Sequence, residues 1–190
     1  MLLRPRLTPK VIAVKYLMPP RLYPYMPQKA ADFRYYFGSD FMSIAKAETD
    51  RIWFVDQDVW RCLLILEVGF LEVEVRRGWW VDFASIPGIL ESIEKRDDRT
   101  GLIAAILHDA FFEMSYPSYQ SANSIFYQVM KLEGASSWTT WSRWRGVETS
   151  KGYDAWLKCD EEEHHQYASR WVTIREVPCV SPAFKHLEKL

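Results

Sequence analysis

Two carboxylates and an imidazole stand in apolar stretches of the chain, where a charge is costly unless it is paired or used. Asp82 follows two tryptophans in GWWVDFASIP, residues 78–87, and His108 and Asp109 interrupt the apolar stretch AAILHDAFFEM, residues 104–114. Imidazole and carboxylate groups are ligands that Zn²⁺ and similar divalent ions accept, with one position left for water. These three residues are therefore the first candidates for a metal site.

Each candidate also has a purely structural interpretation. Asp82 and Ser85 could cap the turn at the end of the aromatic strand. His108 could be a core histidine bonded to a backbone carbonyl, with Asp109 exposed or paired to an arginine. As neighbours on a helix, His108 and Asp109 would stand about 100° apart, so we expect them to flank a common cleft rather than to point at one partner.

Two further groups of reactive side chains are weaker candidates. Cys62 could serve as a nucleophile only in a polar setting, but RCLLILEV, residues 61–68, predicts a buried structural thiol. In CDEEEHHQY, residues 159–167, helical spacing would bring acids and histidines together as Glu161 with His165 or Asp160 with His164. A solvated helix face explains this stretch better than a metal site.

The elements that would position these residues predict an α+β domain. GFLEVEVR, residues 69–76, alternates apolar and charged side chains and follows two short apolar, aromatic-rich stretches, so it indicates a half-buried antiparallel strand. We expect a small antiparallel sheet from about residue 50 to 82, packed by three helices through about 146. The expected strands are 52–56, 60–66 and 69–76, and the expected helices are 100–113, 118–132 and one that holds Trp138, Trp141 and Trp144.

Details of these helices are predicted as well. Asp98 or Thr100 would cap the first helix, and Gly134 would end the second. The three tryptophans recur every third residue, which favours a packing face for the third helix. The charged, aromatic stretch 158–172 would form a last helix.

The composition along the chain divides it into three predicted segments. Residues 1–31 hold six of the ten prolines, six basic residues and no acid, which indicates an extended arm. It is either a flexible tail or an arm that lies along a neighbouring subunit or an anionic surface. The core would be residues 32–156, followed by a helical or irregular extension over residues 157–190.

The motifs resemble a known family. GWWVDFASIP, AAILHDAFF and SANSIFYQVMKLEGAS are similar, in this order and spacing, to the phage and prophage family called domain of unknown function 1353. The resemblance covers roughly residues 50–156, and matches at Asp82, Ser85, Pro87, His108 and Asp109. It implies a phage or prophage gene, and the family has no established activity.

Two positions depart from that family's usual pattern. Val81 stands where the family usually has threonine, and Asn123 stands where the third motif usually has aspartate. Asn123 would keep an oxygen donor near the other three residues but would remove a charge, so affinity for a hard cation should fall. It would act as a weak ligand or as an orienting group.

The overall composition limits which cellular compartments and binding partners are expected. With 24 basic and 25 acidic residues among 190, the net charge is −1, so nucleic acid is not an expected partner. Three cysteines without metal-type spacing indicate a reducing interior. No apolar run is long enough for a membrane span, and MLLRPRLTPK makes a poor signal peptide. We expect the host cytoplasm or the virion.

Two functions remain open. One is a metal-dependent hydrolase in which Asp82, His108 and Asp109 hold one divalent ion, Zn or Mn, with help from Asn123. The alternative is a non-enzymatic virion protein that binds other virion proteins, or itself, through its arm and its tryptophan-rich face. A third function, a host-directed inhibitor, has no sequence feature that distinguishes it from the virion protein.

Overall fold

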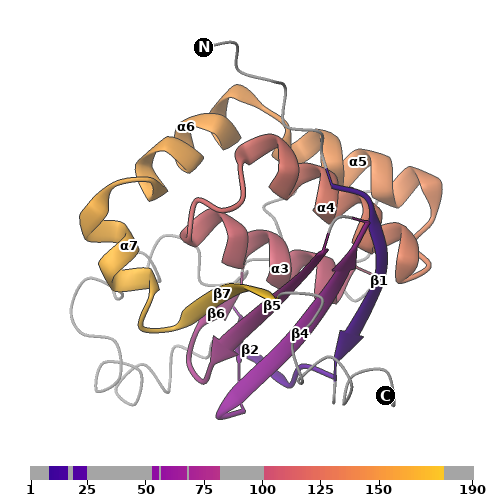
Figure 1. The fold of residues 1–190 in the computed structure, drawn as a ribbon. Coiled ribbons are helices and arrows are strands. Elements are labelled where there is room, and N and C mark those ends of the chain that lie inside the picture. The colour runs from indigo at the N-terminus through magenta and orange to yellow at the C-terminus, as the bar shows by residue number, and fades with distance from the viewer. Residues whose placement is uncertain are drawn as a thin grey trace.

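The computed structural model describes residues 9–16, 19–24, 53–55, 57–67, 69–81 and 101–177. Within them, a four-stranded antiparallel sheet in the order β1-β4-β5-β7 packs against helices, which confirms the α+β class (Figure 1). The strands are β1 (Val11–Tyr16), β2 (Leu22–Pro24), β3 (Trp53–Val55), β4 (Val59–Leu66), β5 (Gly69–Arg76), β6 (Trp80–Val81) and β7 (Val172–Val177). The helices are α3 (Leu102–Glu113), α4 (Tyr119–Leu132), α5 (Ser137–Val147), α6 (Ser150–Cys159) and α7 (Glu162–Ala168).

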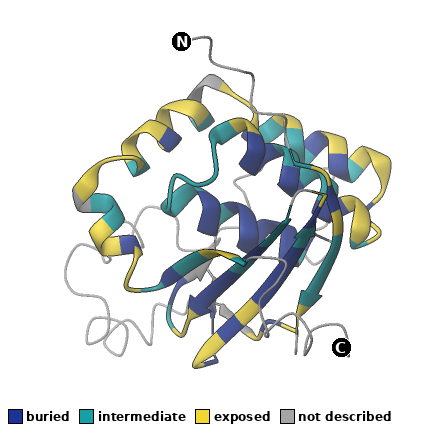
Figure 2. Cartoon of the chain, viewed as in Figure 1, coloured by how far each residue is buried: buried dark blue, intermediate teal, exposed yellow. Residues whose placement is uncertain are grey.

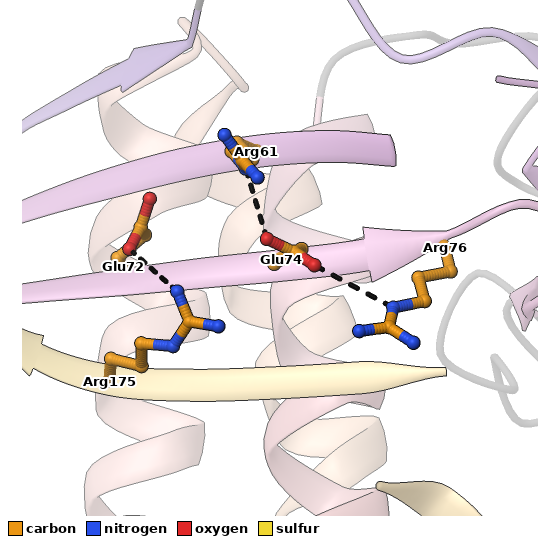
Figure 3. A network of polar contacts seen from close by, with 5 residues as sticks. All are labelled: Arg61, Glu72, Glu74, Arg76 and Arg175. Atoms are coloured by element: carbon orange, nitrogen blue, oxygen red, sulfur yellow. Dashed lines mark hydrogen bonds and ion pairs between the residues drawn. The ribbon is translucent and has the colours of Figure 1, made fainter. Parts of the chain in front are cut away.

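The β4–β5 hairpin is the centre of the large sheet, and its alternating sequence decides which face meets the helices. Leu71, Val73 and Val75 are buried as predicted and face the helical layer. The charged residues between them, Glu72 and Glu74, form ion pairs on the other face (Figure 3). Arg61–Glu74 and Arg175–Glu72 are cross-strand pairs, and Arg76–Glu74 lies within β5.

The two outer strands of this sheet come from the ends of the described chain. β1 lies within the predicted arm and pairs with β4, while β7 lies within the predicted C-terminal extension and pairs with β5. The domain boundaries at residues 31 and 157 stay a prediction. Both flanking segments nevertheless contribute a strand to the sheet of the core. A separate small sheet has the order β2-β3-β6.

Helix α3 lies at the centre of the helical layer, and eight of its twelve residues are buried. Its N-cap is Gly101, with φ 90°, while Asp98 and Thr100 lie outside the described residues. The free N–H groups of Ile103 and Ala104 are instead bound by the two carboxylate oxygens of Glu133, at 3.0 and 2.9 Å. This contact ties the start of α3 to the end of α4, and it complements the helix dipole.

The helices after α3 confirm the sequence predictions in part. The helix expected to begin near Ser118 or Ser121 is α4, which Ser118 caps, and Gly134 follows its end with φ 84° as predicted. The tryptophan stripe of α5 was predicted to pack, but Trp138 and Trp141 are exposed and Trp144 alone packs against the core. The helix predicted over residues 158–172 was wrong in its bounds. Instead, α6 ends at Cys159, α7 covers the middle of this stretch, and β7 begins at its end.

The solvent exposure of each element depends on its place in the sheet or in the helical layer. Strand β4 and helix α3 are mostly buried, while α5, α6 and α7 present exposed outer faces (Figure 2). No helix in the described ranges has the length and apolar character that crossing a bilayer requires.

Candidate functional site

His108 on α3 and Asn123 on α4 meet inside the protein. The His108 Nε2 atom lies 3.0 Å from the Asn123 Oδ1 atom, and both side chains are buried. Ser118 fixes the start of α4, which places Asn123 in its second turn, among residues that face the core. Because an amide oxygen only accepts hydrogen bonds, Nε2 carries the proton and donates it to Oδ1.

The surroundings of His108 keep its ring neutral. The ring centroid lies 4.3 Å from that of Phe112 and 4.8 Å from that of Phe126. Burial among these groups lowers the pKa of His108 to about 4, and the hydrogen bond to Asn123 opposes that shift only in part. At neutral pH the ring is therefore uncharged, and its Nδ1 atom carries a lone pair.

A carboxylate lies near this nitrogen atom. The Nδ1 atom lies 3.6 Å from Asp109 Oδ1, which is too long for a hydrogen bond, and it has no hydrogen-bond partner within the described residues. Asp109 is partly exposed, with 15% of its side chain accessible. A nitrogen without a hydrogen-bond partner among the described residues thus lies beside a carboxylate oxygen.

Tyr119 supports Asn123 from one turn earlier on α4. Its hydroxyl group shares its proton between the carbonyl oxygens of Val147 and Thr149, at 2.9 and 3.1 Å. Burial raises the pKa of Tyr119, and an interaction with Asn123 acts in the opposite direction. The first turn of α6 lies tightly against the end of α5 here, because a Cβ atom at Gly152 would clash with the Val147 carbonyl oxygen. Tyr119 thus joins the helix that carries Asn123 to the start of α6.

The other predicted residues have different outcomes. Asp82, Ser85 and Pro87 lie outside the described residues, so whether Asp82 joins His108 and Asp109 stays a prediction. Cys62 is buried in β4, and burial raises its pKa, as expected of a structural thiol. Within the described ranges, no group of three or more histidine, cysteine or acidic side chains has the arrangement of a metal site.

A second histidine–carboxylate pair joins α7 to the end of α3. His164 Nε2 donates to Glu113 Oε2 at 2.7 Å, and this bond raises the pKa of His164 while partial burial opposes it. The local pairing of Asp160 with His164 is absent from the described contacts, and His165 lies 3.8 Å from Asp160 instead. Sequence reasoning missed the long-range pair, since Glu113 and His164 are 51 positions apart.

Comparison with known proteins gives one match. No curated protein matches the chain, and no solved structure matches it either. Residues 64–147, less than half of the chain, match the family model described as Protein of unknown function (DUF1353), and this segment contains Asp82, His108, Asp109 and Asn123.

Proposed function

We propose that His108 and Asp109, with Asp82 as a third ligand, hold one divalent ion, Zn or Mn, in a metal-dependent hydrolase. One observation carries the proposal. His108 is held neutral, its Nε2 proton is bound by Asn123, and its Nδ1 atom, which has no hydrogen-bond partner among the described residues, lies 3.6 Å from the Asp109 carboxylate. Imidazole nitrogen and carboxylate oxygen are compatible donors for these ions.

The contact between His108 and Asn123 supports the assignment of roles. A histidine that binds a metal usually donates its second ring N–H to an oxygen acceptor, which fixes the tautomer and the orientation of the ring. Asn123 supplies that acceptor here, so its Oδ1 atom is already used by His108. Asn123 is thus an orienting group in this proposal rather than a ligand. Its amide orients the histidine ring without adding a negative charge.

The protein side of the chemistry follows from these positions. A divalent ion in such a site supplies a bound water whose pKa lies near neutrality. Burial of His108 excludes water from the ring and keeps it in the unprotonated form that can bind a cation. Asp109 is more exposed than His108, so it lies on the side from which a substrate would approach.

Elemental mass spectrometry of the purified protein tests this proposal. We expect about one equivalent of Zn or Mn per chain after incubation with the ion, and loss of that metal in His108→Ala, Asp109→Asn and Asp82→Ala. Asp109→Asn keeps the shape of a partly exposed side chain, so it guards against a result caused by misfolding. His164→Ala is the matched control and should retain the metal.

The opposite result is equally clear. A folded wild-type protein that takes up no metal from excess ion would contradict the metal site. Equal metal content in wild type, Asp109→Asn and Asp82→Ala would place any bound ion elsewhere.

A non-enzymatic virion role is the second candidate, and the exposed Trp138 and Trp141 favour it. Large aromatic side chains are enriched in protein interfaces and are unusual in contact with water. In this account the gene belongs to a phage or prophage, as the motif resemblance implies, and the predicted arm, residues 1–31, adds further contacts. An assembly role requires the tryptophan surface to bind another protein molecule.

A further inference from the structure

One flank of the helical layer carries an aromatic surface with basic neighbours. We call Trp138, Trp141 and Arg145 the α5 surface, since they lie three and four positions apart on α5. Trp138 and Trp141 are 52% and 48% exposed, and their rings stack with centroids 5.3 Å apart. Two stacked indoles in water leave a large apolar area uncovered.

Cations outnumber acids around this surface, although Glu148, the C-cap of α5, lies 4.0 Å from Arg145. The α5 sequence contains two arginines and no acid. Lys131, at the end of α4, adds a third cation, because its Nζ atom binds the Ser137 hydroxyl group at the start of α5. Glu133, the acid that precedes α5, is turned to the N-terminus of α3.

The opposite flank carries an aromatic surface with acidic neighbours. We call Tyr153, Leu157 and Glu161 the α6 surface, because they lie four positions apart along α6 and its end. Tyr153 and Leu157 are 45% and 48% exposed. The stretch 153–162 contains four acids, all exposed, and a single lysine.

The packing of the helices places these surfaces on different sides of the molecule. α5 packs on α4, whereas α6 and α7 pack on α3, so the α3–α4 pair separates the two surfaces (Figure 1). Both outer faces are exposed in Figure 2. A contact between the two would therefore join different patches of two molecules, which is a heterologous, head-to-tail arrangement.

We propose that the α5 surface of one molecule binds the α6 surface of a second copy. Each surface has what the other lacks: two tryptophans with cations on one, and tyrosine and leucine with carboxylates on the other. Burial of the aromatic rings supplies the affinity, and opposite charges align the two molecules. The molecule at each end of such an assembly keeps one unused surface, so the contact builds a chain or a closed ring. This inference does not depend on the His108 site.

Sedimentation velocity on the full chain, over a wide range of micromolar concentration, tests the proposal. We expect the mean mass to rise above that of one chain with concentration, and to fall when salt screens the charges. Arg145→Glu and Glu161→Arg should each weaken association at least about tenfold, and the double variant should recover part of it. Trp138→Ser should have the same effect as Arg145→Glu.

Mixing Trp138→Ser with Glu161→Arg separates this arrangement from a symmetric one. Trp138→Ser keeps its α6 surface and Glu161→Arg keeps its α5 surface, while the two changed surfaces do not complement each other, so the mixture can form one contact and should stop at a dimer. Ile12→Ser, at an exposed side chain on β1, is the control and should associate like wild type.

Three results would overturn the proposal. The first is a single-chain mass at every concentration, and the second is association that Trp138→Ser and Arg145→Glu leave unchanged. The third is binding of a single-stranded oligonucleotide that depends on Trp138 while the mass stays that of one chain, since the α5 surface would then serve nucleic acid instead.

Discussion

Helix α3 carries two histidine–carboxylate contacts whose physical character is opposite. In its middle, buried His108 lies 3.6 Å from Asp109 and donates to a neutral amide, and its pKa falls to about 4. At its end, partly exposed His164 lies 2.7 Å from Glu113, and its pKa rises. Burial outweighs the hydrogen bond to Asn123 in the first case, and a direct hydrogen bond to the carboxylate outweighs burial in the second.

This difference assigns different roles to the two histidines. His164 becomes a cation that links α7 to the last turn of α3, and such a link contributes to stability only while the charge is present. His108 stays neutral, so its unused lone pair is available to a cation rather than to a proton. This comparison is the reason that the proposed metal site includes the buried pair and not the exposed one.

The largest expected effect is a loss of stability at acidic pH that depends on His108. Its native pKa of about 4 lies below the ordinary 6.5, so the unfolded chain binds more protons between these values. The contribution of neutral His108 to the free energy of unfolding is therefore fully present above about pH 6.5. It falls by about 3 kcal/mol as the pH drops to about 4. Urea unfolding across this range, compared between wild type and His108→Gln, measures the effect, and equal pH slopes for both proteins would contradict it.

For His164 the sign is reversed. Because its pKa is raised, its contribution to stability is present below about 6.5 and disappears as the pH rises through the higher native value. His164→Gln should therefore cost stability at mildly acidic pH and cost less at alkaline pH. The two glutamine variants should show opposite changes of slope in the same experiment.

A smaller effect is expected when the partner of each histidine is changed. Asn123→Leu removes the acceptor of a buried N–H group, which should cost about 1–3 kcal/mol of unfolding free energy. Glu113→Gln is the matched change at the other pair. It keeps an oxygen acceptor in a more exposed place, so it should cost less than about 1 kcal/mol. Urea unfolding at neutral pH compares the two, and equal costs would remove the distinction between the pairs.

Much of the fold could be predicted because the relevant signals are local. The alternation over residues 69–76 indicates β5 with its buried face, and Ser118 and Gly134 mark the ends of α4. β1 and β7 could not be predicted in this way, since their partners lie far away in the sequence. Proline density around β1 argued against a strand, but an outer strand tolerates neighbouring prolines because one of its edges is unpaired.

The site illustrates the same limit. Motif spacing brought His108, Asp109 and Asn123 forward as candidates, but the 3.0 Å contact between His108 and Asn123 depends on how α4 packs on α3. In the same way, a spacing of three tryptophans predicts that they share one side of α5. It does not predict that Trp144 packs inward while Trp138 and Trp141 remain in water.

The most direct test of this account is nuclear magnetic resonance of the histidine ring nitrogens between pH 4 and 9, with His164→Gln to assign the signals. We predict that His108 stays neutral with its proton on Nε2 down to about pH 5, while His164 is protonated to higher pH than a free histidine. A proton on Nδ1 of His108, or a His108 ring that becomes charged at or above about pH 6.5, would contradict the account, because no lone pair would then face Asp109.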